Sequence, residues 1–210
     1  IIKILKNKFS ENFETIEIAG PGFINFKLKK SFLSQQLLQI ISKKNNYGKN
    51  EIGKNKSVLV EFVSANPTGP LTIGHGRGAI LGDTISNILK WSGYKVQREY
   101  YFNNAGRQMR LLGQSVYARY SELLGKKCEF PKGGYEGKYI YEIAEKIIKK
   151  HGDKFIKDNQ NSIFKNFAES HIFENIKSTL SNLGLVFDSF FNEHELYKNK
   201  EIYNVIEELK

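Results

Sequence analysis

One short segment of the chain combines glycines with a histidine, and these residue types at this spacing can handle a phosphate. Residues 64–78 read Ser-Ala-Asn-Pro-Thr-Gly-Pro-Leu-Thr-Ile-Gly-His-Gly-Arg-Gly. Glycines at 74, 76 and 78 remove the side chains that would keep a phosphate away from the backbone. His75 could donate a hydrogen bond to a phosphate oxygen and stabilise charge that develops during group transfer, which is typically worth roughly 3 to 4 kcal/mol.

The flanking patterns predict that this segment joins a strand to a helix. Residues 58–63 form a nearly continuous apolar run, typical of a parallel strand buried on both faces, and Pro67 and Pro70 would end it. From Gly74 onward, helical spacing predicts a helix that closes near residues 91–93, and the free N–H groups at its N-terminus would attract an anion. Its predicted apolar stripe consists of Leu81, Ile85, Ile88 and Leu89.

Close packing without a ligand is the alternative explanation of such a turn, and the spacing alone leaves both open. Two other phosphate loops are excluded. The chain has no Gly-x4-Gly-Lys-Ser/Thr, and it has no acidic residue at the distance typical of a dinucleotide fold, because Asp83 lies too near, on the helix itself.

The predicted fold class is α/β, a Rossmann-like open parallel sheet with helices on both faces, preceded by part of a small α+β domain. Residues 96–102 read as the second parallel strand, reached by a right-handed crossover. Ligands of such sheets bind beyond the carboxyl ends of the strands, where residues 64–68 and 102–106 fall.

Residues 65–75 resemble the ATP-binding signature of class I aminoacyl-tRNA synthetases in its arginyl form. Residues 18–26 and 94–106 also resemble that family, in the same order along the chain, and the resemblance is clearest over residues 16–124. The signature comprises Ala65, Asn66, Pro67, Thr68, Gly69, Pro70, Leu71, Thr72, Ile73, Gly74 and His75.

The resemblance implies an arginine site. Glu61, a carboxylate in an apolar run, needs a partner if it is buried. By the resemblance it faces the substrate guanidinium, whose planar fork suits a carboxylate; a structural pair with a Lys or Arg is the alternative. Asn66 matches the position that holds the α-amino group, and Ser64 is a lesser arginine-binding candidate.

The resemblance also implies an ATP site and a reaction. The arginine carboxylate would attack the α-phosphate of ATP, supplied with Mg2+ as a substrate complex, and arginyl-adenylate would then charge tRNA. No protein-bound metal is expected, and arginine activation would require bound tRNA. Thr72 and His75 are the expected catalytic residues. The expected ATP-binding residues are Pro67, Thr68, Gly74, His75 and Gly78.

Three features depart from the family pattern. Thr72 stands where family members usually have His, and a threonine cannot carry positive charge. Asn104 stands where Asp is common. The family's Lys-Met-Ser-Lys-Ser loop is absent from these 210 residues, so we expect half of a catalytic centre, with both ends cut from a longer protein.

Composition sets independent limits. The 32 basic and 22 acidic residues give a net charge of +10, which favours a polyanion partner such as RNA, although a compositional bias would explain it equally well. A single cysteine, Cys128, excludes an intrachain disulfide and a cysteine-based zinc cluster, and a cytoplasmic location is expected. No apolar run approaches the roughly 18 residues of a membrane span, so no membrane partner is expected.

We expect residues 1–50 to be the C-terminal part of a tRNA-contacting domain plus a linker. Residues 51–210 would form the first half of the catalytic domain, with a helical insertion at about 125–185. The whole enzyme is expected to be a monomer. Two alternatives stay open, a catalytically silent basic module that binds RNA and another nucleotidyltransferase of the same fold.

Overall fold

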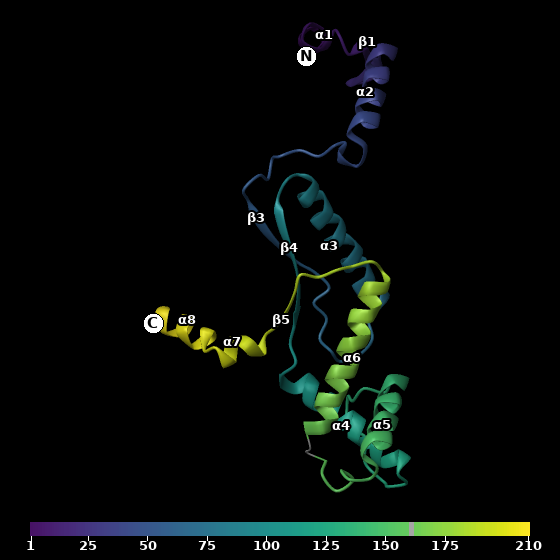
Figure 1. The fold of residues 1–210 in the computed structure, drawn as a ribbon, viewed down its shortest axis with the longest axis vertical. Helices are drawn as coiled ribbons and strands as arrows, with labels where there is room; N and C mark the ends of the chain where they lie inside the picture. Colours follow the sequence, from purple (N-terminus) through teal and green to yellow (C-terminus); the bar gives the residue numbers. More distant parts are fainter. Residues whose placement is uncertain (160–161) are drawn as a thin grey trace. The chain divides into compact units, whose positions relative to one another are not determined.

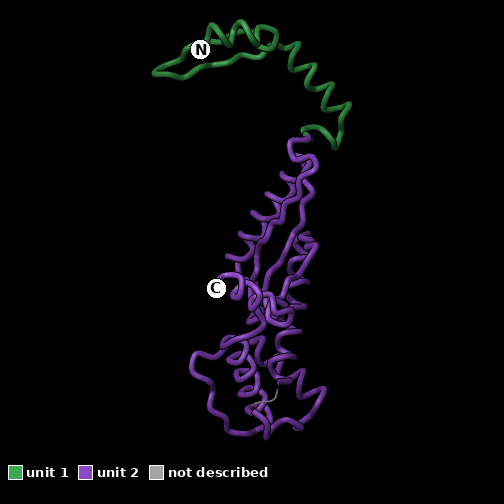
Figure 2. The backbone as a smooth tube through the Cα atoms, turned by 90° about the vertical axis from the view of Figure 1, so that its left-hand side faces the viewer, with its two compact units in different colours: residues 1–50 green, residues 51–210 purple. Residues whose placement is uncertain are grey.

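The computed structural model describes residues 1–159 and 162–210 and divides into two compact units, residues 1–50 and 51–210 (Figure 2). The first unit begins with helix α1 (Ile2–Phe9) and a hairpin of β1 (Phe13–Ala19) and β2 (Phe23–Leu28), which pair antiparallel. Gly20 and Gly22 both have positive φ, which permits the tight reversal between the two strands. Helix α2 (Lys30–Lys43) and a 3₁₀ turn, η1 (Lys44–Asn46), complete the unit.

The second unit is built on a parallel sheet. Strands β3 (Ser57–Glu61), β4 (Lys95–Phe102) and β5 (Ser189–Asn192) are hydrogen-bonded in the order β3-β4-β5. The predicted α/β class with a Rossmann-like parallel sheet is therefore confirmed. The first strand is shorter than predicted, because the chain turns at Val63 and Ser64, whose φ values are +68° and +45°.

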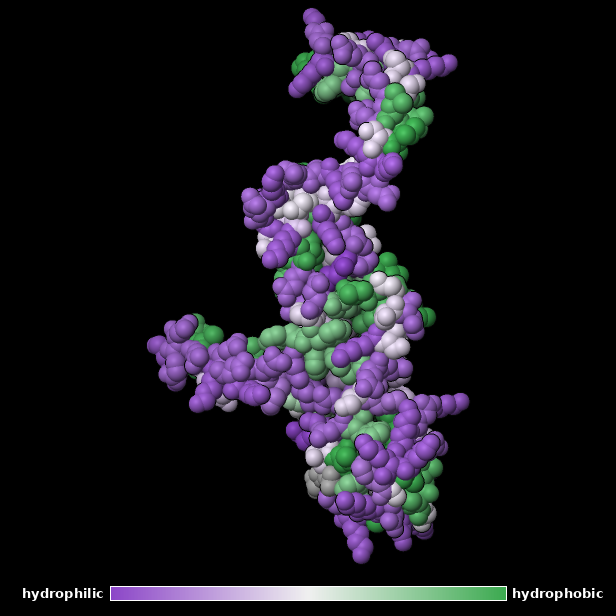
Figure 3. All heavy atoms as spheres, in the orientation of Figure 1, coloured by the Kyte–Doolittle hydropathy of each residue, from purple (hydrophilic) through white to green (hydrophobic). Residues whose placement is uncertain are grey.

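Helix α3 (Ile73–Trp91) connects β3 to β4, as predicted, but it turns a different face to the sheet. Its buried residues are Ala79, Gly82 and Ser86, whereas Leu81 of the predicted stripe is 61% exposed. The small residues allow close approach, since a Cβ at Gly82 would lie 2.2 Å from Cγ of Phe62. Hydrophobic residues are therefore left on the surface, where they lie among hydrophilic ones (Figure 3).

Three helices follow β4 and carry most of the core: α4 (Gly106–Leu123), α5 (Lys138–His151) and α6 (Ser162–Asn182) (Figure 1). α4 packs against both α5 and α6. Helices α7 (His194–Lys198) and α8 (Glu201–Glu208) end the chain. The fully buried residues of the three core helices include Leu112, Val116, Tyr120, Ile143, Ala144, Ile147, Ala168 and Ile176.

Helices α3 and α6 both lie against one face of the sheet. Arg98 of β4 is bonded to Asp83 and Asn87 of α3, and two positions further along Tyr100 makes an edge contact with Phe173 of α6. Alternate strand residues point to opposite faces. On the other face Leu59 is 54% exposed, so the expectation that the first strand is buried on both sides is wrong. Within residues 1–159 and 162–210, β3 is an edge strand that pairs with β4 alone.

Candidate functional site

The predicted phosphate-handling residues lie at the N-terminus of α3. Thr72 is the N-cap, and a capping box joins it to His75, the third residue of the helix. The Thr72 backbone N–H donates to Nδ1 of His75 at 3.0 Å, and the Thr72 Oγ1 lies 3.0 Å from the same nitrogen. The first helical bond runs from the Gly76 N–H to the Thr72 carbonyl at 3.1 Å. Space is open where side chains at Gly76 and Gly78 would stand.

A buried tyrosine supports the turn that precedes this helix. The Tyr100 hydroxyl accepts a hydrogen bond from the Ala65 N–H at 3.1 Å and donates one to the Ala65 carbonyl at 2.8 Å. Burial raises the pKa of Tyr100 to about 12, so the hydroxyl stays protonated and can donate at neutral pH.

A second tyrosine reaches the turn from helix α5. The Tyr139 hydroxyl donates to the Thr68 carbonyl at 2.8 Å, and a Cβ at Gly69 would lie 3.0 Å from that oxygen. Burial raises the pKa of Tyr139 to about 12 as well. Pro67, between the two supported positions, is buried. Neither tyrosine belongs to the signature, and the sequence carried no local signal for these contacts.

Asn66 joins the turn to the end of β4 and the start of α4. Its Oδ1 accepts from the Asn103 N–H at 2.9 Å, and its Nδ2 donates to Oε1 of Gln108 at 3.0 Å. A carbonyl-type oxygen has two lone pairs, so Oδ1 can accept one more hydrogen bond. Asn66 therefore combines a structural contact with one free acceptor position, which fits the predicted role toward an amino group.

Glu61 stands at the end of β3 and is exposed. Its Oε1 accepts from the Ser64 Oγ at 2.7 Å, and Ser64 Oγ in turn accepts from the Tyr101 N–H at 3.2 Å. Among the ion pairs of residues 1–159 and 162–210, none includes Glu61, so the structural-pair alternative finds no support there. Glu61 is the register partner of Glu99.

The same acidic surroundings affect Tyr101. The pKa of the Tyr101 hydroxyl is raised, chiefly by burial. The Glu193 carboxylate is the next cause, and Glu61 contributes as well. Another carboxylate, that of Glu169, contacts the segment that follows β4. Its Oε1 accepts from Nδ2 of Asn104 at 2.6 Å. A carboxylate at position 104 would meet Glu169 as a like charge, whereas the amide bonds to it. Sequence reasoning missed Glu169, which lies 65 residues away on α6.

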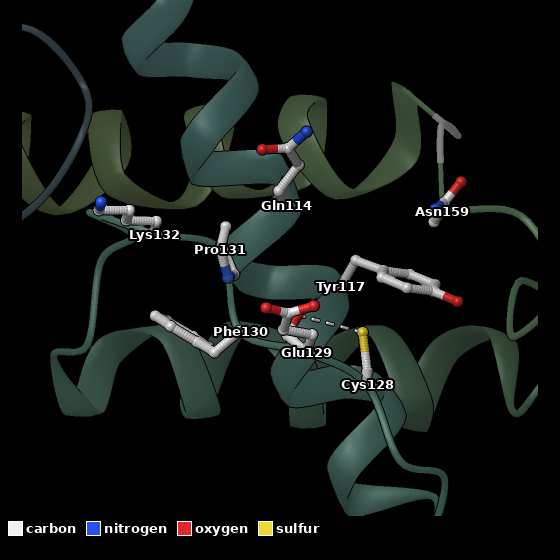
Figure 4. Close-up of a pocket in the computed structure, with 8 residues that line it drawn as sticks. All are labelled: Gln114, Tyr117, Cys128, Glu129, Phe130, Pro131, Lys132 and Asn159. Atoms are coloured by element: carbon white, nitrogen blue, oxygen red, sulfur yellow. Dashed lines mark hydrogen bonds between the residues drawn. The ribbon is translucent and has the colours of Figure 1, made fainter.

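One side-chain pocket, of about 320 Å³, includes Pro70 of the signature, and others lie away from it. A pocket of about 380 Å³ is lined by residues that include Asn104, Arg110 and Glu169. Another, of about 260 Å³, holds Cys128 and lies among the helices (Figure 4). No group of three His, Cys, Asp or Glu side chains in the described part of the chain could hold a metal, and no described helix is long and apolar enough to cross a membrane.

Comparison with known proteins identifies the family. The model of tRNA synthetases class I (R), catalytic domain, matches residues 36–210. The chain belongs to the class I arginyl-tRNA synthetase family. It is 53% identical over 201 residues to an arginine–tRNA ligase of Chlorobium phaeobacteroides, covering 95% of this chain and 36% of that protein. It is 48% identical over 195 residues to one of Desulfotalea psychrophila, covering 93% of this chain and 35% of that protein.

Solved arginyl-tRNA synthetase structures agree. A crystal structure assigned to an arginyl-tRNA synthetase of Campylobacter jejuni has a TM-score of 0.75 at 36% identity and covers 86% of this chain and 40% of its own. The Thermus thermophilus arginyl-tRNA synthetase, at 23% identity and a TM-score of 0.50 over 91% of this chain and 32% of its own, supports the fold alone. The chain spans about a third of the length of the curated synthetases that it matches.

Proposed function

We propose that this chain supplies the ATP- and arginine-binding half of a class I arginine–tRNA ligase. The observation that carries the proposal is the capped N-terminus of α3, with His75 beside open space at Gly76 and Gly78, in a chain of the arginyl family. Neither substrate needs a protein nucleophile, because the arginine carboxylate attacks the α-phosphate of ATP directly, forming arginyl-adenylate and displacing pyrophosphate. Catalysis is then positioning and charge stabilisation.

The residues divide by chemistry. The helix N-terminus offers backbone N–H groups and a positive dipole to the phosphates, with Gly74, His75 and Gly78 nearest and Pro67 and Thr68 shaping the turn before it. ATP would arrive with its own Mg2+, as a substrate complex.

The arginine side of the site lies at the ends of β3 and the turn. Glu61, exposed and free of ion pairs among the described residues, would face the guanidinium, with Ser64 holding its Oε1. Asn66 would accept from the α-amino group with its remaining lone pair. The net charge of +10 suits a tRNA partner, and the complete enzyme would act in the cytoplasm as a monomer.

The test uses the full-length protein. ATP–pyrophosphate exchange is measured with each of the twenty amino acids, with and without total tRNA. Exchange with arginine alone, and only when tRNA is present, supports the proposal. Exchange with another amino acid would point to a different nucleotidyltransferase, and no exchange under any condition would favour a silent RNA-binding module.

A further inference from the structure

Two atoms of Thr72 converge on one nitrogen of the His75 ring. The backbone N–H of Thr72 lies 3.0 Å from Nδ1, and the Thr72 Oγ1 lies 3.0 Å from that same atom. The two residues are also the two ends of the capping box that starts α3. The threonine hydroxyl is therefore engaged with its own helix rather than directed at a ligand.

The backbone contact decides which nitrogen carries hydrogen. A backbone N–H can only donate, so Nδ1 must offer its lone pair, and the neutral ring must carry its hydrogen on Nε2. A ring protonated on both nitrogens would set the Nδ1–H against the Thr72 N–H and break the capping box. The capping box at the N-terminus of α3 therefore requires a neutral His75 ring with its hydrogen on Nε2.

We infer that Thr72 is a positioning residue, which holds His75 as a neutral ring whose Nε2–H is the donor toward an anion at the α3 N-terminus. Thr72 itself makes no contact with that anion. If the proposed function holds, the anion is a phosphate of ATP. The inference rests on that function only for the identity of the anion. Positive charge at the site comes from the helix terminus, not from position 72 or 75.

A glutamine at position 75 can reproduce both ends of this ring. Its Oε1 can accept from the Thr72 N–H, as the third residue of a capping box commonly does, and its amide N–H can donate outward. A lysine carries charge and donors but no acceptor. The inference therefore ranks His75→Gln above His75→Lys in pyrophosphate exchange, whereas a role through positive charge ranks them in reverse.

The direct test is the nitrogen NMR signature of the His75 ring in the full-length protein, assigned by its loss in His75→Ala. The Nε2–H tautomer is expected in the wild type and in Thr72→Ser. Thr72→Ala keeps the backbone N–H, so it is expected to keep the Nε2–H tautomer. In Thr72→Pro, which lacks that N–H, a population with hydrogen on Nδ1 is expected, with arginine-dependent exchange lowered about fivefold in kcat and the KM for arginine unchanged. Thermal melting confirms that each variant is folded.

A wild-type ring with hydrogen on Nδ1 overturns the inference, as does a folded Thr72→Pro variant whose spectrum is identical to that of the wild type, or a Lys variant more active than the Gln variant. If the wild-type protein shows no exchange with arginine, the proposed function fails, while the ring signature still decides the role of Thr72.

Discussion

The buried hydroxyl of Tyr100 bonds both backbone groups of Ala65, accepting at 3.1 Å and donating at 2.8 Å. Tyr100→Phe keeps the ring but leaves a partly buried N–H and C=O unpaired, so we expect a loss of about 1 to 3 kcal/mol in the free energy of unfolding. Urea denaturation measures it. Tyr203→Phe, at an exposed site on α8, is the matched control and should change stability little; equal effects of the two changes would contradict the supporting role.

Tyr100 also makes stability depend on alkaline pH. Its pKa is about 12 in the folded state against 10.0 for a free tyrosine, so between these values the folded state holds the proton more tightly. The stabilisation is fully present below about pH 10 and is lost as pH rises toward 12. We expect the stability gap between wild type and Tyr100→Phe to shrink as the pH rises from 10.0 toward about 12. A gap that stays constant across this range would count against it.

Asn66 should contribute more to arginine binding than its hydrogen-bond partner Gln108 does. Asn66→Ala would remove the acceptor that we propose for the amino group as well as the partner of the Asn103 N–H, whereas Gln108→Ala removes only a contact of the Asn66 Nδ2. Because a hydrogen bond to a charged group is worth about 1.5 to 3 kcal/mol, Asn66→Ala should raise the KM for arginine tenfold or more. Similar kinetics for both variants would refute a direct contact.

Glu61→Gln should weaken arginine binding and leave ATP binding unchanged. Glutamine keeps an Oε1 that can accept from Ser64, so the local fold is retained while the charge is lost. We expect the KM for arginine to rise about tenfold or more. Glu99→Gln, at the register partner, is the control. A KM for ATP that rises equally would argue against a guanidinium contact.

Two glycines of α3 should respond to alanine in opposite directions. A Cβ at Gly82 meets the Phe62 ring at 2.2 Å, so Gly82→Ala should lower the free energy of unfolding by about 1 to 3 kcal/mol. A Cβ at Gly76 meets open space, and alanine there should raise stability by up to about 1 kcal/mol. Denaturation midpoints distinguish them, and destabilisation by both would mean that the two positions are equally crowded.

The sequence predicted what is local. The order strand, turn, helix, strand and the helix start at the signature follow from proline positions and apolar spacing. The face of α3 was predicted wrongly, because Gly82 and Ser86 are buried for their small size, which a hydrophobic pattern does not detect. The hydrogen bonds from the Tyr100 and Tyr139 hydroxyls to the turn join residues 35 and 71 positions apart in the sequence, and no local pattern encodes such contacts.

The outer edge of β3 has a practical consequence. In the described part of the chain, no strand pairs with its backbone groups on the side away from β4, and Leu59 is 54% exposed on one face of the strand. Such an edge is a template for pairing with another chain. A preparation of these 210 residues alone should therefore form concentration-dependent aggregates rich in intermolecular strands, and Leu59→Lys should improve its solubility.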